Sequence, residues 1–491
     1  MAARWPVGML AAMPPTPTPP PDPGEPRIRD RGDACPGALR LHSADDGRLA
    51  RLRLPAGRLT ARQVEVLAVA AETLGDGRIS ITSRGNAELR GLADDCGARL
   101  AELLAGAGLL PSPTHERVRN IVASPAAGLD GLGAADVQLW ARELDALLCA
   151  TPWAAALSGR FLFVLDDGRG DVAGLGGDVT LVAVRGGAAL LYVGGRALRV
   201  AAADAARAAL AAAGAFLAAA REAGTGAWRV RELPQGHEPD VPAALTAAGV
   251  PAEPAEPAEP AAVRSHVRTL GPSPAREPEP SQAPARTEAA APGAVPARGL
   301  RPQEPVPARG LRPQEPAPAR GLPPQEPVPP LPQGPPPPPG PLGSAALCLL
   351  APLGRLTAAQ LRALLPADEV RFTPWRGVVV AGAGPERLPA LDAAGLVTRP
   401  DSPWVGVSAC TGRPGCAKSL ADVRADATPG PVGAAHGLPV HFSGCERRCG
   451  HPHGRWTDVL ATPGGDYLVD GVPTPRTALP EAVTRARTTT R

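Results

Sequence analysis

The chain has 491 residues, with 51 basic and 48 acidic side chains and a formal net charge of +3 at neutral pH. This balance does not indicate a nucleic-acid partner, which usually requires a strongly basic surface. Eight cysteines in a chain of this length are far too few for a disulfide-stapled secreted domain. Since no apolar run is long and uninterrupted enough to cross a bilayer, we expect a cytoplasmic protein without membrane spans.

Two segments are too rich in proline to form a packed core. Residues 1–33 include "PPTPTPPPDPGEP", and residues 246–342 contain an 11-residue repeat, "VPARGLRPQEP", which starts at Val295 and again at Val306. Proline fixes φ and removes a backbone donor, so such segments stay extended and unpacked. We therefore expect a disordered N-terminal arm and a long, disordered Pro-rich insertion that serves as a linker.

The remaining two parts of the chain open in the same way. Residues 34–112 contain "GRLTARQ" and residues 343–400 contain "GRLTAAQ". Each phrase lies between a predicted strand and an amphipathic helix, with Thr60 or Thr357 as the N-cap, and a further strand follows. The sequence predicts an internally duplicated strand–helix–strand unit. Such duplications often build one site near a pseudo-twofold axis.

Half of the cysteines lie close together in residues 401–485. Cys410 and Cys416 form a C-x5-C pair, and after a gap of 28 residues Cys445 and Cys449 form a C-x3-C pair. Zinc knuckles usually pair cysteines two to four residues apart, so the wider first pair favours an iron–sulfur cluster, which is a larger body. Zinc stays an alternative, because thiolates suit both, and a reducing compartment disfavours disulfides.

Together these features resemble the sulfite/nitrite reductase superfamily. Within it, "ITSRGNAELRGL", "VRNIVASPAAGLD" and "ACTGRPGCAKSLADVRADA" are similar to the precorrin-3B synthase family. The resemblance implies an α+β fold with two kinds of duplicated unit in a pseudo-twofold arrangement. These are ferredoxin-like half-domains at 34–112 and 343–400, and reductase-type α/β halves at 113–245 and 401–485.

The resemblance also implies which residues hold the cofactor and the substrate. In the reductases the four cysteines bind a [4Fe–4S] cluster, and arginines bind the carboxylates of the tetrapyrrole. Planar guanidinium groups suit carboxylates because they bind in a bidentate way. The expected cluster ligands here are Cys410, Cys416, Cys445 and Cys449, and the expected substrate ligands are Arg84, Arg119, Arg160 and Arg376.

One residue departs from the reductase pattern. Leu162 stands where the reductases keep a lysine that delivers protons to sulfite. This departure disfavours sulfite or nitrite reduction and fits an enzyme whose substrate is the tetrapyrrole itself. The resemblance then implies an O2-dependent monooxygenase that converts precorrin-3A to the hydroxy-γ-lactone precorrin-3B in aerobic cobalamin biosynthesis. Its electrons would come indirectly from NADH, through an electron-donor reductase or ferredoxin.

Several assignments stay open. Reaction with O2 calls for an iron centre, so we expect a second, mononuclear non-haem iron whose ligands the sequence does not identify. No catalytic residue is assigned. The acidic phrase "DDGRGD" (166–171) is expected to form a turn, with cation binding as the alternative. The alternatives to an oxygenase are a siroheme-dependent sulfite or nitrite reductase and a zinc-stabilised interaction protein whose repeats recruit partners.

Overall fold

The computed structural model describes residues 33, 36–255, 330–429, 437–452 and 454–488, which form a mixed α/β structure of four sheets. All of them belong to one of the chain's two compact units, and the other unit, Ala258–Pro327, lies outside the described residues. The predicted N-terminal arm, except Asp33, and the Pro-rich repeats therefore lie outside the described residues as well.

Two five-stranded antiparallel sheets have equivalent strand orders. The first consists of β1 (His42–Ala44), β2 (Gly47–Leu52), β5 (Ala87–Leu92), β4 (Arg78–Ile81) and β14 (Arg355–Thr357). The second consists of β12 (Gly340–Leu342), β13 (Ala346–Leu350), β16 (Gly377–Ala381), β15 (Glu369–Phe372) and β3 (Arg58–Leu59). Each sheet therefore takes its last strand from the other half of the chain.

The exchanged strands pair in equivalent registers. Leu356 of β14 lies opposite Ile79 of β4, and Leu59 of β3 lies opposite Val370 of β15. All four side chains are buried in one hydrophobic core that both sheets share. The two predicted half-domains are therefore not separate folding units, because neither has a complete sheet or a complete core of its own.

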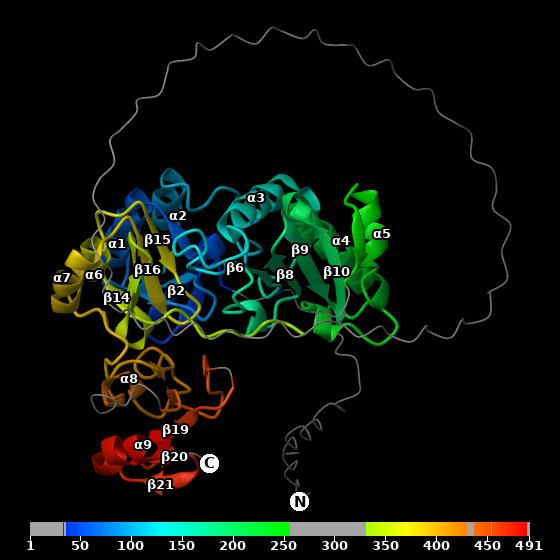
Figure 1. Ribbon diagram of the computed structural model, residues 1–491. Coiled ribbons are helices and arrows are strands. Elements are labelled where there is room, and N and C mark those ends of the chain that lie inside the picture. Colours follow the sequence, from blue (N-terminus) through cyan, green and yellow to red (C-terminus); the bar gives the residue numbers. More distant parts are fainter. Residues whose placement is uncertain (1–32, 34–35, 256–329, 430–436, 453, 489–491) are drawn as a thin grey trace, which may run out of the picture. The chain divides into compact units, whose positions relative to one another are not determined.

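A helix follows each exchanged strand. Helix α1 (Ala61–Leu74) begins at Thr60 and helix α6 (Ala358–Ala363) at Thr357, and each threonine forms a capping box with the glutamine three residues later. The two helices lie side by side (Figure 1). The predicted N-caps are thus present, and α2 (Gly97–Gly106) and α7 (Leu388–Ala393) complete the helices of these two halves.

The other two sheets also share an order of strands, with the first three parallel and the rest antiparallel. One is β6 (Ile121–Ala123), β7 (Phe163–Asp166), β8 (Val179–Val184), β9 (Ala188–Val193), β10 (Arg196–Ala201) and β11 (Ala252–Pro254). The other is β17 (Val407–Ala409), β18 (Val440–Ser443), β19 (Thr457–Ala461), β20 (Tyr467–Val469) and β21 (Val472–Thr474). Helices α3 (Val137–Ala150), α4 (Ala205–Ala223) and α5 (Val241–Ala247) accompany the first sheet, and α8 (Val423–Asp426) and α9 (Leu479–Thr488) the second.

Helix α4 is the one described helix long and apolar enough to cross a membrane by composition, and half of the segment Ala202–Ala223 is buried. Its buried residues, including Ala209 and Phe216, belong to the core beneath β8 and β9, and α3 lies beside it (Figure 1). This packing is that of the core helix of an α/β domain. It makes α4 weak evidence for a membrane span.

The ends of the predicted arm and linker are corrected by the structure. Strands β11 and β12 lie within residues 246–342, and Gly334 donates a hydrogen bond to the Gly170 carbonyl at 3.0 Å. Asp33 accepts hydrogen bonds from Ser158 Oγ at 2.8 Å and from the Gly159 amide at 2.7 Å. These residues find partners in the fold, although the arm and the linker were expected to include them.

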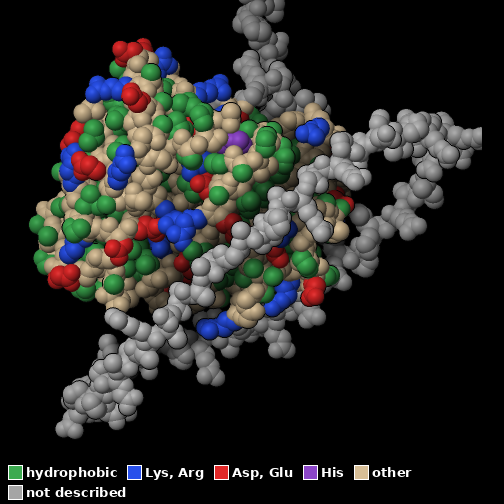
Figure 2. Space-filling model, turned by 90° about the horizontal axis from the view of Figure 1, so that it is seen from above, with side chains coloured by type: hydrophobic (Ala, Val, Ile, Leu, Met, Phe, Trp, Pro, Cys, Tyr) green, Lys and Arg blue, Asp and Glu red, His purple; other side chains and the backbone are tan. Residues whose placement is uncertain are grey.

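On the face shown in Figure 2, outside the grey atoms, basic and acidic groups lie among one another. This mixture agrees with the small net charge of the whole chain.

The strand exchange predicts matched effects at two distant positions. Leu59→Ala and Leu356→Ala each remove a fully buried side chain from the shared core, so each should lower the free energy of unfolding by about 2–5 kcal/mol in urea titrations. Leu132→Ala, at a side chain that is 72% exposed, serves as the control and should have little effect. If Leu59→Ala lowered the free energy of unfolding but Leu356→Ala did not, the strand exchange would be contradicted.

Candidate functional site

The four predicted cluster cysteines follow two neighbouring parallel strands. Cys410 comes directly after β17, and Cys445 comes two residues after the end of β18. The Cys410 amide donates to the Phe442 carbonyl at 3.0 Å, and the Gly444 amide donates to Cys410 Sγ at 3.2 Å. Because the carboxyl ends of parallel strands share one edge of a sheet, both cysteine pairs reach the same region.

The sulfurs are close enough to influence one another electrostatically. Partial burial raises the pKa of the Cys449 thiol, and the Cys410, Cys445 and Cys416 thiols raise it further. The four thiols therefore lie in one neighbourhood, as ligands of one common centre must.

His441 supports the second cysteine pair from inside β18. The ring is fully buried, with Nδ1 at 2.9 Å from Ser408 Oγ and Nε2 at 3.2 Å from the Cys449 carbonyl oxygen. Burial lowers the pKa of His441 to about 3, and Arg376 lowers it further, so the ring stays neutral. Two other histidines of this region, His436 and His453, lie outside the described residues.

Arg376 is the predicted substrate ligand that lies beside the cysteines. Its guanidinium donates to the Gly450 carbonyl at 2.8 Å, in the loop that follows Cys449. Arg376 has φ of +62°, and the equivalent turn of the first half has Gly85 at +68°. A left-handed backbone costs a residue with a side chain about 1–2 kcal/mol. Such strain gathers at functional sites, so its presence at Arg376 favours a role there.

Arg84 and Arg160 lie together at the first α/β half. Arg84 Nη1 donates to the Arg160 carbonyl at 3.4 Å, and the Arg160 guanidinium lies 4.8 Å from the centre of the Trp228 ring. Arg53, which the sequence analysis did not identify, joins them by donating to the Gly159 carbonyl at 3.2 Å. A guanidinium over an aromatic face keeps its polar edge available for an anion.

Arg119 is placed differently from the expectation. It is 5% exposed, and Asp145 binds its Nε and Nη2 in a bidentate ion pair at 2.6 and 2.7 Å. The guanidinium already has a carboxylate partner from helix α3. Its geometry is that of a residue that joins β6 to α3, which argues against a role as a substrate ligand.

Leu162, at the position of the reductase lysine, is 2% exposed. It packs with Val122, Val164 and Val172, and Trp375 closes the group. Burial of an unpaired ammonium group among these side chains would cost a large free energy. The side chains around Leu162 are therefore apolar, and one of them, Trp375, directly precedes Arg376 in the chain.

The first α/β half contains an equivalent of the cysteine site. Ser124 follows β6 as Cys410 follows β17: its amide donates to the Leu165 carbonyl at 3.0 Å, and its Oγ accepts from the Asp167 amide at 3.1 Å. Asp130 comes six residues after Ser124, as Cys416 comes six after Cys410. The backbone at these positions matches the cysteine site, but the side chains differ.

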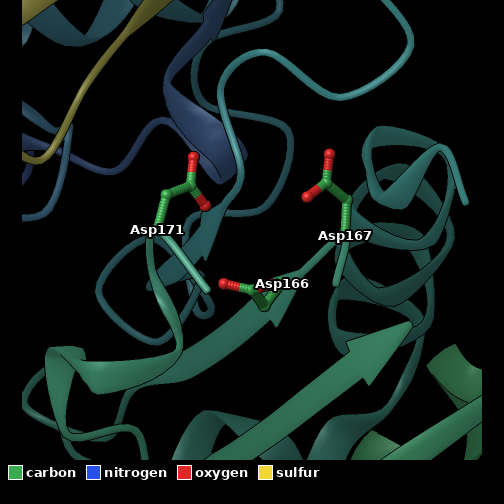
Figure 3. Close-up of side chains that lie close together, drawn as sticks. All are labelled: Asp166, Asp167 and Asp171. Carbon is green, nitrogen blue, oxygen red and sulfur yellow. The ribbon is translucent and has the colours of Figure 1, made fainter. Parts of the chain in front are cut away.

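Carboxylates gather at this equivalent position. Asp166, Asp167 and Asp171 are buried, with oxygens within 4.8 Å of one another (Figure 3). Asp166 accepts four backbone amides, and Asp167 and Asp130 both bind the guanidinium of Arg169. The predicted turn is therefore present, and the cation that it holds is an arginine of the same loop.

Asp171 is the least satisfied member of this group. Its Oδ1 accepts from Ser124 Oγ at 2.6 Å, whereas its buried Oδ2 lacks a hydrogen-bond partner among the described residues. Burial raises the pKa of Asp171 to about 7, against the effect of the Ser124 hydrogen bond, and the charge of Asp166 raises it further. The folded protein thus keeps a proton here at mildly acidic pH.

This proton predicts a pH dependence of stability. Because the folded-state pKa lies above the ordinary value of 3.8, the unfolded chain releases the proton first, and stability should fall as pH rises from about 4 to 7. The slope should reach up to about 1.4 kcal/mol per pH unit. Asp171→Asn should lose this slope, because an amide does not titrate in this range, while its oxygen can still accept from Ser124. Urea titrations at pH 5 and 8 test this, and parallel behaviour of the two proteins would refute it.

Comparisons with known proteins show what this chain is similar to. Residues 42–106 match the nitrite/sulfite reductase ferredoxin-like half domain. The chain is 34% identical over 164 residues to precorrin-3B synthase of Sinorhizobium sp, which covers 33% of this chain and 35% of that protein. It is 42% identical over 84 residues to ferredoxin–nitrite reductase of Synechococcus elongatus, 17% of this chain and 16% of the relative.

The fold is similar to that of the NirA protein of Mycobacterium tuberculosis, with a TM-score of 0.54 and 16% identity over 89% of this chain and 80% of that one. The sequence matches span about a third or less of the length of the curated relatives. Family match, relatives and fold agree with one another. All of these similarities are to proteins of the sulfite/nitrite reductase superfamily, which this chain resembles in one half domain, in part of its sequence and in its fold.

Proposed function

We propose that this protein is an O2-dependent iron–sulfur monooxygenase of the precorrin-3B synthase type, which acts on precorrin-3A in the cytoplasm. The similarity to precorrin-3B synthase supports this, and the buried apolar environment of Leu162 is the observation that carries it. A superfamily member without a proton-delivering lysine here is poorly equipped to reduce sulfite. In the proposed reaction one oxygen atom enters the substrate and the other leaves as water, with consumption of two electrons and two protons.

In this proposal Cys410, Cys416, Cys445 and Cys449 hold a [4Fe–4S] cluster. Their positions after two parallel strands and the mutual electrostatic influence of their thiols support the assignment. The cluster would supply single electrons, obtained indirectly from NADH through a reductase or ferredoxin. A second, mononuclear iron remains part of the proposal, with no residue assigned to it.

The arginines of the site bind substrate carboxylates in this proposal. Arg84 and Arg160 approach from the first half, and Arg376 approaches from the second, beside the cysteines. Trp375 and Leu162 supply apolar surface between them. The contribution of both halves to one site is what we expect if the halves arose by duplication, as their equivalent strand orders suggest.

A siroheme-dependent nitrite or sulfite reductase is the second candidate. The match to ferredoxin–nitrite reductase over 84 residues favours it. The visible spectrum of the purified protein decides between the two, because siroheme has strong absorption bands of its own. Bound siroheme together with turnover of nitrite or sulfite would replace the oxygenase in this proposal.

Cysteine substitution tests the cluster. Any one of Cys410→Ser, Cys416→Ser, Cys445→Ser and Cys449→Ser should remove the iron–sulfur absorption and the O2-dependent turnover together. Cys149→Ser is the matched control, because Cys149 lies on α3 beside Asp145 and Arg119, away from the four cysteines. Iron and acid-labile sulfide counts after anaerobic purification give the readout. A full complement of both in Cys445→Ser would contradict the assignment.

Arginine substitution tests the substrate site. Arg84→Ala and Arg160→Ala should each weaken precorrin-3A binding by about 1.5–3 kcal/mol, the scale of a hydrogen bond to a charged group. Arg119→Ala is the contrast: it leaves Asp145 without its ion-pair partner, so it should lower stability and leave the affinity nearly unchanged. Binding isotherms and urea titrations on the same three variants separate the two effects. The reverse pattern would restore Arg119 to the substrate site.

A further inference from the structure

A cleft of about 650 Å³ lies between the first five-stranded sheet and the loop that separates Cys410 from Cys416. Its size is within the range of small-molecule sites, about 300–1,000 Å³. Five arginines line it. Arg78, Arg90 and Arg355 come from strands β4, β5 and β14, and Arg413 and Arg424 come from the C-terminal part.

Only part of this positive charge is neutralised within the cleft. Asp46 binds Arg90 through two contacts of 2.8 Å, and Asp76 binds Arg355 at 2.5 Å. Arg90 also donates to the Gly415 carbonyl at 2.5 Å, which ties the sheet to the cysteine loop. Among the described residues, no carboxylate lies within 4.0 Å of the guanidinium groups of the other three arginines.

Arg355 shows the effect of this crowding. Burial lowers the pKa of Arg355, and the charges of Arg78 and Arg90 lower it further, against the pull of Asp76. The fold thus holds like charges together at a cost in free energy, which an anion in the cleft would offset.

The equivalent region of the other half does not carry this excess. Glu369 of β15 stands where β4 has Arg78, since each lies one residue before the valine or isoleucine that faces the exchanged leucine. Glu369 binds both Arg58 and Arg371, at 2.7 and 2.6 Å, and so closes the network with an acid. At this one equivalent position the second sheet has an acid, Glu369, and the first sheet has an arginine, Arg78. Only the first sheet therefore keeps an excess of positive charge that could attract an anion.

Arg424 likewise has an equivalent. Gln138 Nε2 donates to the Ser124 carbonyl at 3.0 Å, as Arg424 Nε donates to the Cys410 carbonyl at 3.0 Å. The two residues lie 14 positions after Ser124 and Cys410. The backbone contact therefore needs only a side-chain N–H at this position, and the charge of Arg424 serves something else.

We propose that this cleft binds carboxylates at the periphery of a tetrapyrrole, with Arg78, Arg413 and Arg424 as the ligands. The inference rests on the proposed function for the choice of a tetrapyrrole, and on the geometry above for the choice of residues. Several separated guanidinium groups suit several separated carboxylates better than one compact phosphate. The wall of the cleft is the loop between the first two cysteines, so the bound ring would lie against the cluster region.

Two substitutions test the site, and each introduces the residue that the other half of the protein has at the equivalent position. Arg424→Gln installs the residue of position 138 and keeps the hydrogen bond to Cys410, and Arg78→Glu installs the residue of position 369. The probes are uroporphyrin, with eight carboxylates, and pyrophosphate, measured by equilibrium dialysis on the full-length, cluster-loaded protein. The Kd for uroporphyrin should rise at least tenfold in each variant. Each addition of salt should raise this Kd further. Arg399→Gln, at an exposed arginine, should change it less than twofold.

The outcomes are separable from those of the proposed function. Unchanged uroporphyrin Kd in both variants, at full iron and sulfide content, overturns the proposal. Equal losses of affinity for pyrophosphate and for uroporphyrin would overturn the proposal of a tetrapyrrole ligand, and the cleft would then be a general anion site. Dialysis needs no turnover, so the cleft is tested even if the protein proves to be a reductase. Conversely, precorrin-3A turnover that survives both substitutions supports the oxygenase and rejects the cleft.

Discussion

The reciprocal exchange of one short strand between the two halves is the constraint on which the rest of the structure depends. Strands β3 and β14 complete each other's sheets and share one core, and ion pairs of Arg58 with Glu369 and of Arg355 with Asp76 reinforce both crossings. Residues about 280 and 310 positions apart in the chain are thereby held side by side. The cysteine loops follow the second five-stranded sheet in the chain. The exchange therefore also affects which side chains of the first sheet lie next to them, such as Arg90 beside Gly415.

Parts of this architecture could be predicted from the sequence because they depend on short local patterns. The threonine N-caps of α1 and α6 and the repeated "GRLT" phrase are local, and the structure has both. The superfamily could be recognised from the cysteine spacing and the surrounding phrases. Strand exchange could not be predicted this way, because the pairing of β14 with β4 depends on a core that forms only when both halves are present.

Individual site residues were harder to predict, because their roles depend on partners that are distant in sequence. Arg119 lies in a matched motif, yet Asp145 occupies its guanidinium. Ser124 and Gln138 do not resemble Cys410 and Arg424 as letters, and only their backbone hydrogen bonds show that the positions are equivalent. The half without the four clustered cysteines instead holds Arg169 among carboxylates, so equivalent strand ends carry different polar side chains in the two halves.

The exchange also has a consequence for synthesis on the ribosome. Strand β4 is complete at Ile81, but its partner β14 begins only at Arg355. At about 5–20 residues per second, the edge of β4 waits between roughly a quarter of a minute and a minute for its neighbour. An unpaired strand edge is a template for wrong partners. Arg78, which lies on this edge, places a charge there throughout the wait, so the same side chain that would serve a ligand in the finished protein also protects the nascent one from association.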